Sequence, residues 1–330
     1  MKKIIFPIVF LLMGIPNAKA QFSPQAYQAG SDAIKANESR IQFWAEGCTF
    51  ERGWKNIADT SLGKPVVGNE NSVAGAPDLD VLSLGDGGFA IVTFPHPIRN
   101  GAGPDFAVFE NGFLHPTDST LAYLELAFVE VSSDGVQFFR FPAKSLTQDS
   151  AQIDNFNWID ASKLNNLAGK YINGFGTPFD LEELKDQLGL DVNNITHVKI
   201  IDVVGSLDET YASYDYDGHK INDPYPSAFP SGGFDLNAIG VLNSNATAIS
   251  NIHDNLNAAI YPNPVKDKLH IEIKGEKETR YRIFDLAGKL YFKGKFQSHT
   301  ELSIKNLAKG IYLLELQNDR GSAWEKVIVE

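Results

Sequence analysis

The chain has 330 residues, 43% of them hydrophobic, and a formal net charge of −12 at pH 7. Residues 21–257 carry 13 Lys and Arg against 31 Asp and Glu, a net charge of −18, whereas residues 258–330 carry 13 against 10, a net charge of +3. A field of this sign excludes nucleic acid as a partner, because phosphate binding needs positive charge. The negative charge is compatible with bound calcium, which prefers oxygen ligands. It is also what keeps an exported protein soluble.

The N-terminus has the pattern of a signal peptide over residues 1–20. Lys2 and Lys3 precede an apolar run at 4–15 that is too short to cross a bilayer, and Ala-Lys-Ala at 18–20 supplies a cleavage site. No cysteine follows the run to take a lipid, and no later segment is long and apolar enough to predict a transmembrane helix. The single cysteine, Cys48, is expected to be a buried thiol and not a nucleophile.

Residues 21–247 are predicted to form one acidic β domain. Helices are expected only near Ala26–Ile34 and at Asp180–Leu188, where Asp180 is placed to cap and Gly189 to stop the helix. Many short apolar runs bounded by Gly, Pro, Asn and Asp predict strands, and the absence of a repeat argues against a propeller. The clearest runs are 89–94, 105–110, 127–132, 137–141, 197–203 and 238–242. The expected fold is mainly β, a jelly-roll or galactose-binding-like β-sandwich.

Two of these runs resemble a known kind of sandwich. Phe128–Gly135 reads as a hairpin turned by Ser-Ser-Asp-Gly, and Val198–Gly205 is a second apolar strand. Together they resemble the central strands of discoidin-like carbohydrate-binding sandwiches. The resemblance implies architecture, and no binding residue is taken from it.

The segment Gly101–Gly112 brings acidic residues to a strand. Alternation places Asp105 and Glu110 at opposite ends and on opposite faces, so they do not form a glycosidase pair with each other. With Asn111 and Asp235 they are candidates for a second cation or for a loop site. This segment and Pro224–Leu236 resemble an uncharacterised module of bacterial cell-surface proteins.

The segment from Asp215 to Asp223 spaces oxygen ligands around Gly218, as a calcium loop requires. It resembles dockerin-like and thrombospondin-type calcium loops, although the downstream bidentate Glu of an EF-hand is missing. An Asp-rich turn also forms without any metal. The candidate calcium ligands are Asp215, Asp217, Asn222 and Asp223, with Asp208 or Glu209 as further possibilities.

The sequence contains none of the common catalytic motifs for zinc, acyl transfer, phosphate or dinucleotide binding. Carboxylates brought together from distant strands would leave no such motif, so a hydrolase stays open. Aromatic residues in loop-like sequence are candidates for stacking on a flat ligand. The predicted ligand-binding aromatic residues are Trp158, Tyr214, Tyr216 and Tyr225.

Residues 248–260 are expected to be a linker, and 261–330 a small immunoglobulin-like β-sandwich. Alternating runs follow the rigid Tyr-Pro-Asn-Pro entry at Tyr261, Pro262, Asn263 and Pro264. Three ordered motifs, Tyr-Pro-Asn-Pro-Val, Phe284–Lys289 and Leu307–Leu314 with Gly310 and Tyr312, resemble the C-terminal sorting domain of type IX secretion substrates. The resemblance implies export through the periplasm to the cell surface or the medium, with the secretion machinery as a partner.

Three functions remain open for the acidic domain. The favoured hypothesis is a calcium-stabilised module that binds a glycan or another small extracellular ligand. The second is a secreted hydrolase that acts on polysaccharide or peptide through carboxylates, and the third is a structural protein of the envelope. A convergent carboxylate pair would favour the second hypothesis.

Overall fold

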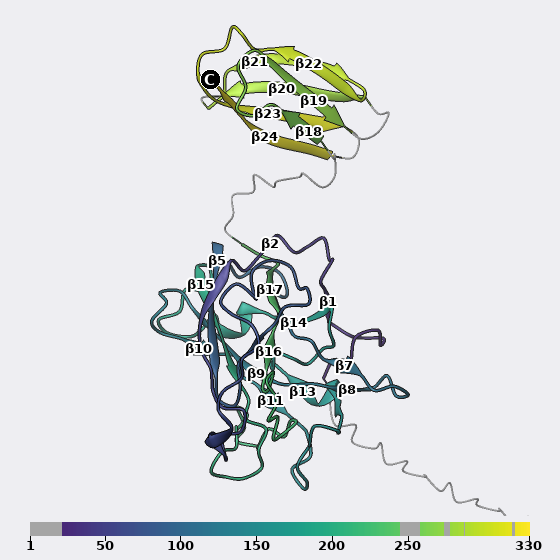
Figure 1. The fold of residues 1–330 in the computed structure, drawn as a ribbon, viewed down its shortest axis with the longest axis vertical. Coiled ribbons are helices and arrows are strands. Elements are labelled where there is room, and N and C mark those ends of the chain that lie inside the picture. Colours follow the sequence, from purple (N-terminus) through teal and green to yellow (C-terminus); the bar gives the residue numbers. More distant parts are fainter. Residues whose placement is uncertain (1–21, 245–257, 274–277, 287, 319–320) are drawn as a thin grey trace, which may run out of the picture. The chain divides into compact units, whose positions relative to one another are not determined.

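The structure is a computed structural model that describes residues 22–244, 258–273, 278–286, 288–318 and 321–330. The chain divides into two compact units, with the boundary between Asn245 and Ala246 (Figure 1). Regular structure in both is almost entirely strand, so the mainly β fold expected from the sequence is confirmed. The predicted signal peptide and most of the predicted linker lie outside the described residues.

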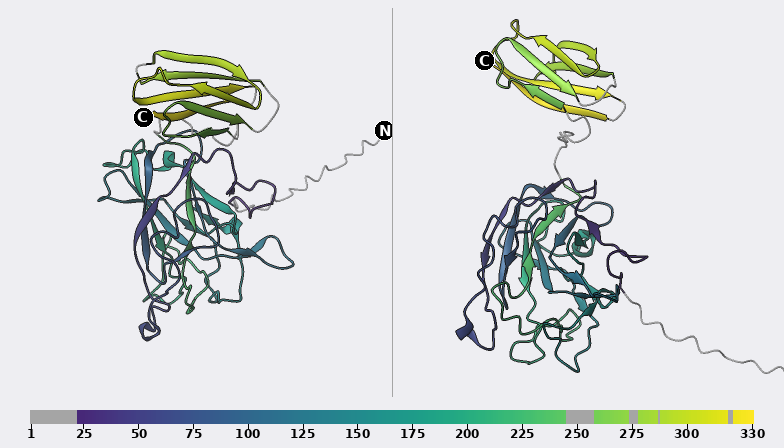
Figure 2. Two further views of the ribbon diagram at one scale, coloured as in Figure 1. Left: turned by 45° about the horizontal axis from the view of Figure 1, so that its top comes forward. Right: turned by 45° about the vertical axis from the view of Figure 1, so that its right-hand side comes forward.

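The central unit is built on two antiparallel sheets, ordered β1-β14-β6-β17-β2 and β10-β9-β15-β5-β3. Strands β5, β10 and β15 lie to one side of β14 and β17 in Figure 1, and Figure 2 shows the same two layers from other directions. The first sheet contains β1 (Ile34–Lys35), β2 (Phe43–Trp44), β6 (Phe106–Phe109), β14 (Phe175–Phe179) and β17 (Ala238–Val241). The second contains β3 (Gly47–Glu51), β5 (Phe89–Ile98), β9 (Ala127–Ser132), β10 (Phe139–Arg140) and β15 (Ile195–Asp202).

The main hydrophobic core lies between the two sheets. Val92, Val129 and Val198 are fully buried there, from β5, β9 and β15. All four residues of β6 are buried, because one face of this strand joins the core and the other packs against the N-terminal segment around β1 and β2. A strand covered on both faces reads as an unbroken apolar run, and this explains the sequence of β6.

Smaller elements fix the long loops. A three-stranded sheet has the order β12-β8-β7, and two pairs are formed by β11 with β13 and by β16 with β4. A second apolar cluster supports this region, and Leu124, Leu126 and Ile159 are buried in it. The strands are β4 (Leu82–Ser83), β7 (Phe113–Leu114), β8 (Leu121–Tyr123), β11 (Lys144–Ser145), β12 (Ile159–Asp160), β13 (Leu164–Asn165) and β16 (Asp235–Leu236).

Both helix predictions need correction. Residues 26–34 form turns that lead into β1, because Tyr27 and Gly30 have left-handed φ angles of 70° and 87°, which no α-helix contains. Asp180 does cap the second segment, accepting a hydrogen bond from the Glu182 amide. The helix is only a 3-10 turn, η3 (Leu181–Leu184), since the next apolar residue, Leu188, is 95% exposed and adds no packing. The other 3-10 turns are η1 (Thr60–Leu62) and η2 (Ala161–Lys163).

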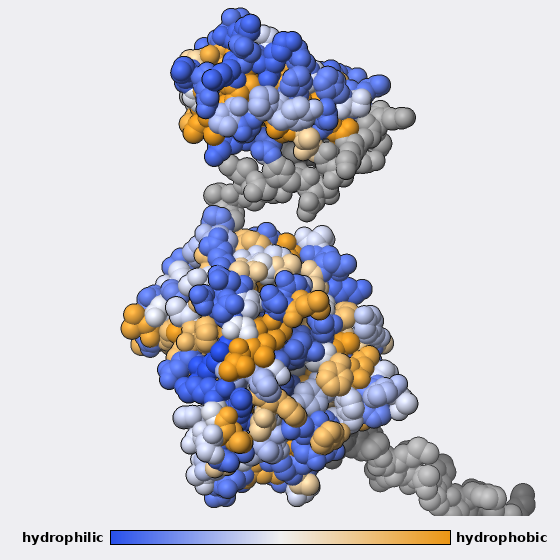
Figure 3. Space-filling model, in the orientation of Figure 1, coloured by the Kyte–Doolittle hydropathy of each residue, from blue (hydrophilic) through white to orange (hydrophobic). Residues whose placement is uncertain are grey.

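The surface of the central unit is mixed in character. On the face in Figure 3, hydrophobic residues form small patches among hydrophilic ones. Within the described residues, no helix is long and apolar enough to cross a membrane. Single apolar side chains on such a surface are ordinary, and only groups of them indicate a binding site.

The C-terminal unit contains two antiparallel sheets, ordered β18-β19-β22 and β21-β20-β23-β24. Its buried residues include Ile271, Ile283 and Leu314, which the alternating pattern places inward. The strands are β18 (Ala258–Tyr261), β19 (Lys268–Ile273), β20 (Thr279–Asp285), β21 (Leu290–Phe296), β22 (His299–Ser303), β23 (Gly310–Asn318) and β24 (Gly321–Val329).

The entry motif of this unit makes specific contacts. The Asn263 side chain donates to the Lys326 carbonyl at 2.6 Å and accepts from the Ile328 amide at 2.9 Å, so it ties the motif to β24. The Tyr312 hydroxyl donates to the Ala308 carbonyl at 2.9 Å. The motif residues therefore hold this small sandwich together.

Candidate ligand-binding site

Six acidic side chains, which we call the carboxylate cluster, lie at one end of the two central sheets. Glu110 directly follows β6, and Asp235 begins β16, just before β17. Because β6 and β17 are antiparallel neighbours, the end of β6 lies beside the beginning of β17, and these two positions are at the same end of the first sheet. The cluster consists of Asp86, Glu110, Glu125, Asp202, Asp223 and Asp235, each at most 8% exposed.

The second sheet contributes to the same end. Asp202 is the last residue of β15, Glu125 lies two residues before β9, and Asp86 lies three before β5. β15 runs antiparallel to both of those strands, so its end meets their beginnings. The amide of Phe234, next to Asp235, donates to Asp202 Oδ1 at 2.7 Å and joins the ends of the two sheets.

Five of the six carboxylates accept hydrogen bonds that hold loops. Asp202 also accepts from the Gly87 amide at 3.0 Å, and Asp223 accepts from the Leu126 amide at 2.8 Å. Asp86 accepts from the Ile57 amide at 2.8 Å, and Glu110 from the Gly112 amide at 2.7 Å. Asp235 accepts from the Ser83 hydroxyl and, at 3.0 Å, from the Asn111 side chain.

Glu125 is the exception. Its residue is 8% exposed, and no hydrogen bond or ion pair to its carboxylate is found among the described residues. Its strongest charged neighbour is Glu110, followed by Asp235, Asp223 and Asp202. The neighbouring Leu126 amide bonds to Asp223, which brings that carboxylate beside Glu125. Glu125 therefore faces the other carboxylates without a partner of its own.

The cluster has no positively charged counterpart. In the described parts of the chain, no Lys, Arg or His lies within ion-pair distance of its members. Burial is the main reason why the pKa of each of the six is raised, to about 6 for Asp86 and well above the ordinary value for Glu110 and Glu125. For Glu110 the charge of Asp235 raises the pKa further.

An aromatic group, formed by Phe113, His115, Tyr123 and Trp158, lies on the small sheet β12-β8-β7. Phe113 pairs with Tyr123 across the strands, and their rings stack with centroids 5.2 Å apart. Trp158 meets the Phe113 ring edge-on at 5.7 Å and the His115 ring at 4.7 Å. Phe113 is 55% exposed, so the group presents an apolar ring face to water.

Tyr123 connects the aromatic group to the carboxylate cluster. Its ring stacks on Phe113, while its phenol has Glu125, Asp223, Glu110 and Asp235 as charged neighbours. Burial, followed by these charges, raises the pKa of Tyr123, so the phenol stays protonated. The site thus combines exposed ring faces, a hydroxyl donor and several carboxylates within one region.

The structure brings together three of the four residues predicted as a second cation or loop site. Asn111 bonds to Asp235, and Glu110 has Asp235 as its strongest charged neighbour. Asp105 lies at the other end of β6, where its carboxylate accepts from the Leu181 and Gly101 amides and the Asn243 side chain. Asp105 is therefore a loop anchor and lies away from this site.

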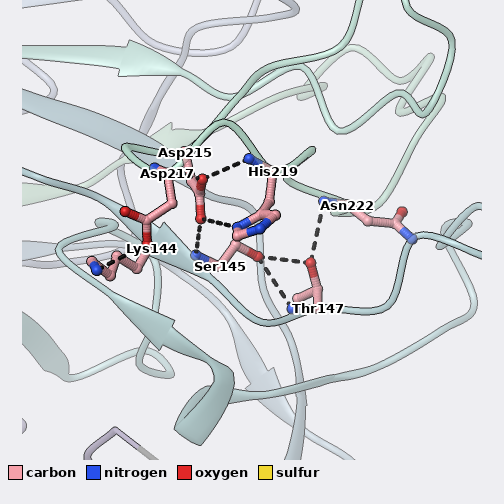
Figure 4. A network of polar contacts seen from close by, with 7 residues as sticks. All are labelled: Lys144, Ser145, Thr147, Asp215, Asp217, His219 and Asn222. Atoms are coloured by element: carbon pink, nitrogen blue, oxygen red, sulfur yellow. Dashed lines mark hydrogen bonds and ion pairs between the residues drawn. The ribbon is translucent and has the colours of Figure 1, made fainter.

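The four predicted calcium ligands make separate contacts, and Figure 4 shows three of them, Asp215, Asp217 and Asn222. The Asp215 carboxylate accepts from the amides of Ser145, Asp217 and His219 at 2.8–3.1 Å. Asp217 pairs with the Lys144 ammonium at 2.9 Å. These contacts shape the turn without a metal, and calcium in this loop stays a prediction.

The side chains of the remaining two predicted ligands, Asn222 and Asp223, contact residues outside the Asp215 turn. The Asn222 side chain donates to the carbonyls of Gln148 and Ala151 and accepts from the Ile153 amide. Asp223 belongs to the carboxylate cluster. In the described residues, no group of three or more His, Cys, Asp or Glu side chains is arranged to hold a metal ion.

The four predicted stacking residues do not form one surface. Trp158 belongs to the aromatic group, whereas Tyr214 and Tyr216 are 44% and 74% exposed on the Asp215 turn. The Tyr225 hydroxyl donates to the Asn56 side chain at 2.9 Å. Of the four, only Trp158 contacts another member of the candidate site.

A separate cleft of about 460 Å³ lies on the second sheet. It contains Cys48, whose pKa is raised to about 11 by burial and by Glu70, so the thiol stays protonated at neutral pH and is a poor nucleophile. None of the predicted site residues and no member of the carboxylate cluster lines it. Its lining residues are Glu46, Gly47, Cys48, Thr49, Glu70, Asn71, Ile91, Thr93, Gly135 and His197.

The sequence interpretation missed Glu125, Asp202 and Asp86 as site residues. Two of them had a detectable signal, because a charged residue enclosed by apolar neighbours in a strand-like run is unusual. Glu125 lies between Leu124 and Leu126, and Asp202 follows Ile201. Asp86 lies between glycines and carried no such signal.

Comparison with known proteins identifies the C-terminal unit. Residues 259–330 match the model of a family described as secretion system C-terminal sorting domain. The chain therefore carries a type IX sorting domain, and the protein is exported to the cell surface or secreted, with the secretion machinery as a partner. No curated protein matches the chain.

Solved structures give only a distant likeness. A β-glucuronidase from Ruminococcus gnavus in complex with D-glucaro-d-lactam has a TM-score of 0.23 at 12% identity, over 90% of this chain and 45% of that chain. The apo form of the same enzyme gives 0.22 at 12% identity, over 90% and 44%. The chain thus spans less than half the length of these structures, and TM-scores this low carry no argument about fold or function.

Proposed function

We propose that the central unit is an extracellular module that binds a glycan at the junction of the aromatic group and the carboxylate cluster. The observation that carries the proposal is Tyr123, whose ring stacks within the aromatic group and whose hydroxyl is subject to the charges of Glu125, Asp223, Glu110 and Asp235. A sugar ring offers an apolar face for stacking and hydroxyl groups for hydrogen bonds to carboxylates, so it matches both parts.

The export of the protein agrees with this role. A sorting domain places the central unit outside the cell or on its surface, where polysaccharides and glycoproteins are the common polymers. The exposed Phe113 ring would contact the ligand first, and the half-buried Trp158 would form the side of the platform. Phe113 is therefore the residue to change first.

The proposal is tested by calorimetric titration of the protein with soluble oligosaccharides found in a glycan-array screen. We expect Phe113→Ala to weaken binding about tenfold, equivalent to about 1.4 kcal/mol, because the stacking face is removed. Phe156→Ala is the matched control, since Phe156 is 86% exposed in the same unit and makes no ring contact in the described residues. Equal loss in both variants, or no glycan binding at all, would contradict the proposal.

One observation favours a second function, hydrolysis of the bound glycan. Glu110 is the strongest charged neighbour of Glu125, and both carboxyl groups have raised pKa values, as a general acid requires. Release of reducing ends from a bound oligosaccharide, lost in Glu125→Gln, would establish an enzyme. Binding of the glycan without its hydrolysis would reject the enzyme and support the binding module alone.

A further inference from the structure

The six members of the carboxylate cluster have no ion-pair partner among the described residues, in contrast to Glu130 and Asp217 of the same unit. Glu130 pairs with Arg140 at 2.8 Å and Asp217 with Lys144 at 2.9 Å, both near the surface. The cluster is at most 8% exposed, and its charges are opposed only by backbone amides and a few polar side chains. Buried carboxylates without a cation destabilise the folded state, so the site favours a positively charged ligand.

Glu125 gives an independent indication of a ligand. The residue is only 8% exposed, its carboxylate accepts no hydrogen bond from the described residues, and the charges of Glu110, Asp235, Asp223 and Asp202 act on it. A buried polar group without a partner usually has a water, an ion or a ligand as its missing contact. The remaining 8% exposure leaves Glu125 in contact with solvent.

The surroundings suit an organic cation. Aromatic rings attract ammonium groups through their faces. The Tyr123 ring, whose hydroxyl is subject to the charges of the carboxylates, stacks on Phe113, and Phe113 in turn contacts Trp158. A metal ion instead needs several side-chain oxygens around one point, and the described residues offer no such group of three. Carboxylates next to ring faces are the arrangement that recognises an amine carried on a flat or ring-shaped body.

We propose that the site selects amino sugars with a free, positively charged amine over neutral or N-acetylated sugars. The inference rests on the proposed glycan binding and adds the chemical class of the ligand. The sugar ring stacks on the Phe113 side of the aromatic group, and the ammonium group reaches Glu125. Glu125 is the residue that distinguishes the charged amine from its neutral derivative.

The test uses the full chain and three probes of equal length: glucosamine, N-acetylglucosamine and glucose oligomers. Calorimetric titration at pH 7 is expected to give at least tenfold tighter binding of the glucosamine oligomer. Binding of the ammonium group favours the ionised carboxylates, so we expect protons to be released on binding. Titrations in buffers with different ionisation enthalpies count these protons.

Two variants locate the effect. Glu125→Gln should reduce the preference for the free amine below about threefold and reduce the proton release. Asp217→Asn is the matched control, because it also removes one negative charge from the same unit but lies in the Asp215 turn, paired with Lys144. Thermal unfolding checks that each variant is folded, and Asp235→Asn serves as a second cluster variant.

Each other outcome overturns the inference. Equal binding of the three oligomers would leave the proposed function standing and remove amine selection. A preference that survives both Glu125→Gln and Asp235→Asn would place amine recognition outside the cluster. Calcium that raises the Tm of the native chain but not of Glu125→Gln would make the site a metal site. If none of the oligomers binds, the proposed function fails together with the inference.

Discussion

The central unit contains two acidic regions that differ in how the chain assembles them and in the partners of their carboxylates. The Asp215 turn is a local motif in which Asp215 accepts three backbone N–H groups and Asp217 pairs with Lys144. The carboxylate cluster is assembled from six separate positions and has no ion-pair partner in the described residues. A regular spacing of acidic residues can thus serve the turn itself, whereas the carboxylate cluster is assembled from strand ends far apart in the chain.

The largest expected effect is that of Asp202→Ala. The buried amide of Phe234 loses its acceptor, which costs about 1–3 kcal/mol, and the amide of the exposed Gly87 loses a hydrogen bond for about 0.5–1.5 kcal/mol more. We expect a loss of about 2–4 kcal/mol in the free energy of unfolding, measured by urea titration. Asp217→Ala is the control from the other region and should cost less than about 1 kcal/mol, because its ion pair is exposed. Similar losses in the two variants would remove the distinction between the regions.

The second prediction concerns pH. The pKa of Asp86 is about 6 in the folded state against an ordinary 3.8, so the folded state binds more protons than the unfolded state between these values. The contribution of Asp86 to the free energy of unfolding is therefore fully present below pH 4 and is lost as the pH rises to about 6. The decrease for Asp86 alone is about 2–3 kcal/mol.

Asp86→Asn should flatten this part of the stability profile, measured by urea unfolding at pH 4, 5, 6 and 7. Asp217→Asn is the control variant, because it removes one carboxylate from the other acidic region of the same unit. A profile that rises from pH 4 to 6 in the native chain would contradict the assignment.

The smallest expected effect is that of calcium on the Asp215 turn. The sequence predicts an ion there, but it would have to replace three amide hydrogen bonds to Asp215. We expect the Tm measured by calorimetry with excess calcium to lie within about 2 °C of that with chelator, a difference under about 1 kcal/mol. A larger rise that Asp217→Ala abolishes would establish the calcium loop and make the two regions alike.

The strands could be predicted from the sequence because their signal is local. Alternation located β5, β9 and β15, and the unbroken apolar run located β6. The helix at 26–34 was wrong, since left-handed residues at Tyr27 and Gly30 are not visible in an apolar pattern. The local sequence pattern therefore predicts the strands, but it does not predict the left-handed residues that prevent a helix at 26–34.

The candidate site was only partly predictable. The structure places Asn111 and Glu110 near Asp235, whereas Asp105, which the prediction grouped with them, lies at the other end of β6. Strand membership does not tell which loops meet at an end, since that depends on sheet order. Glu125 joins the group only through the antiparallel pairing of β9 with β15.

The position of Trp158 gives the site a built-in optical reporter. Its indole touches Phe113 and His115, so a ligand that covers these rings changes the polarity around one particular fluorophore. The chain has only three other tryptophans, and two of them, Trp44 and Trp54, belong to the N-terminal part of the central unit. Emission spectra of the native chain and of Trp158→Phe would therefore follow occupancy without any added label.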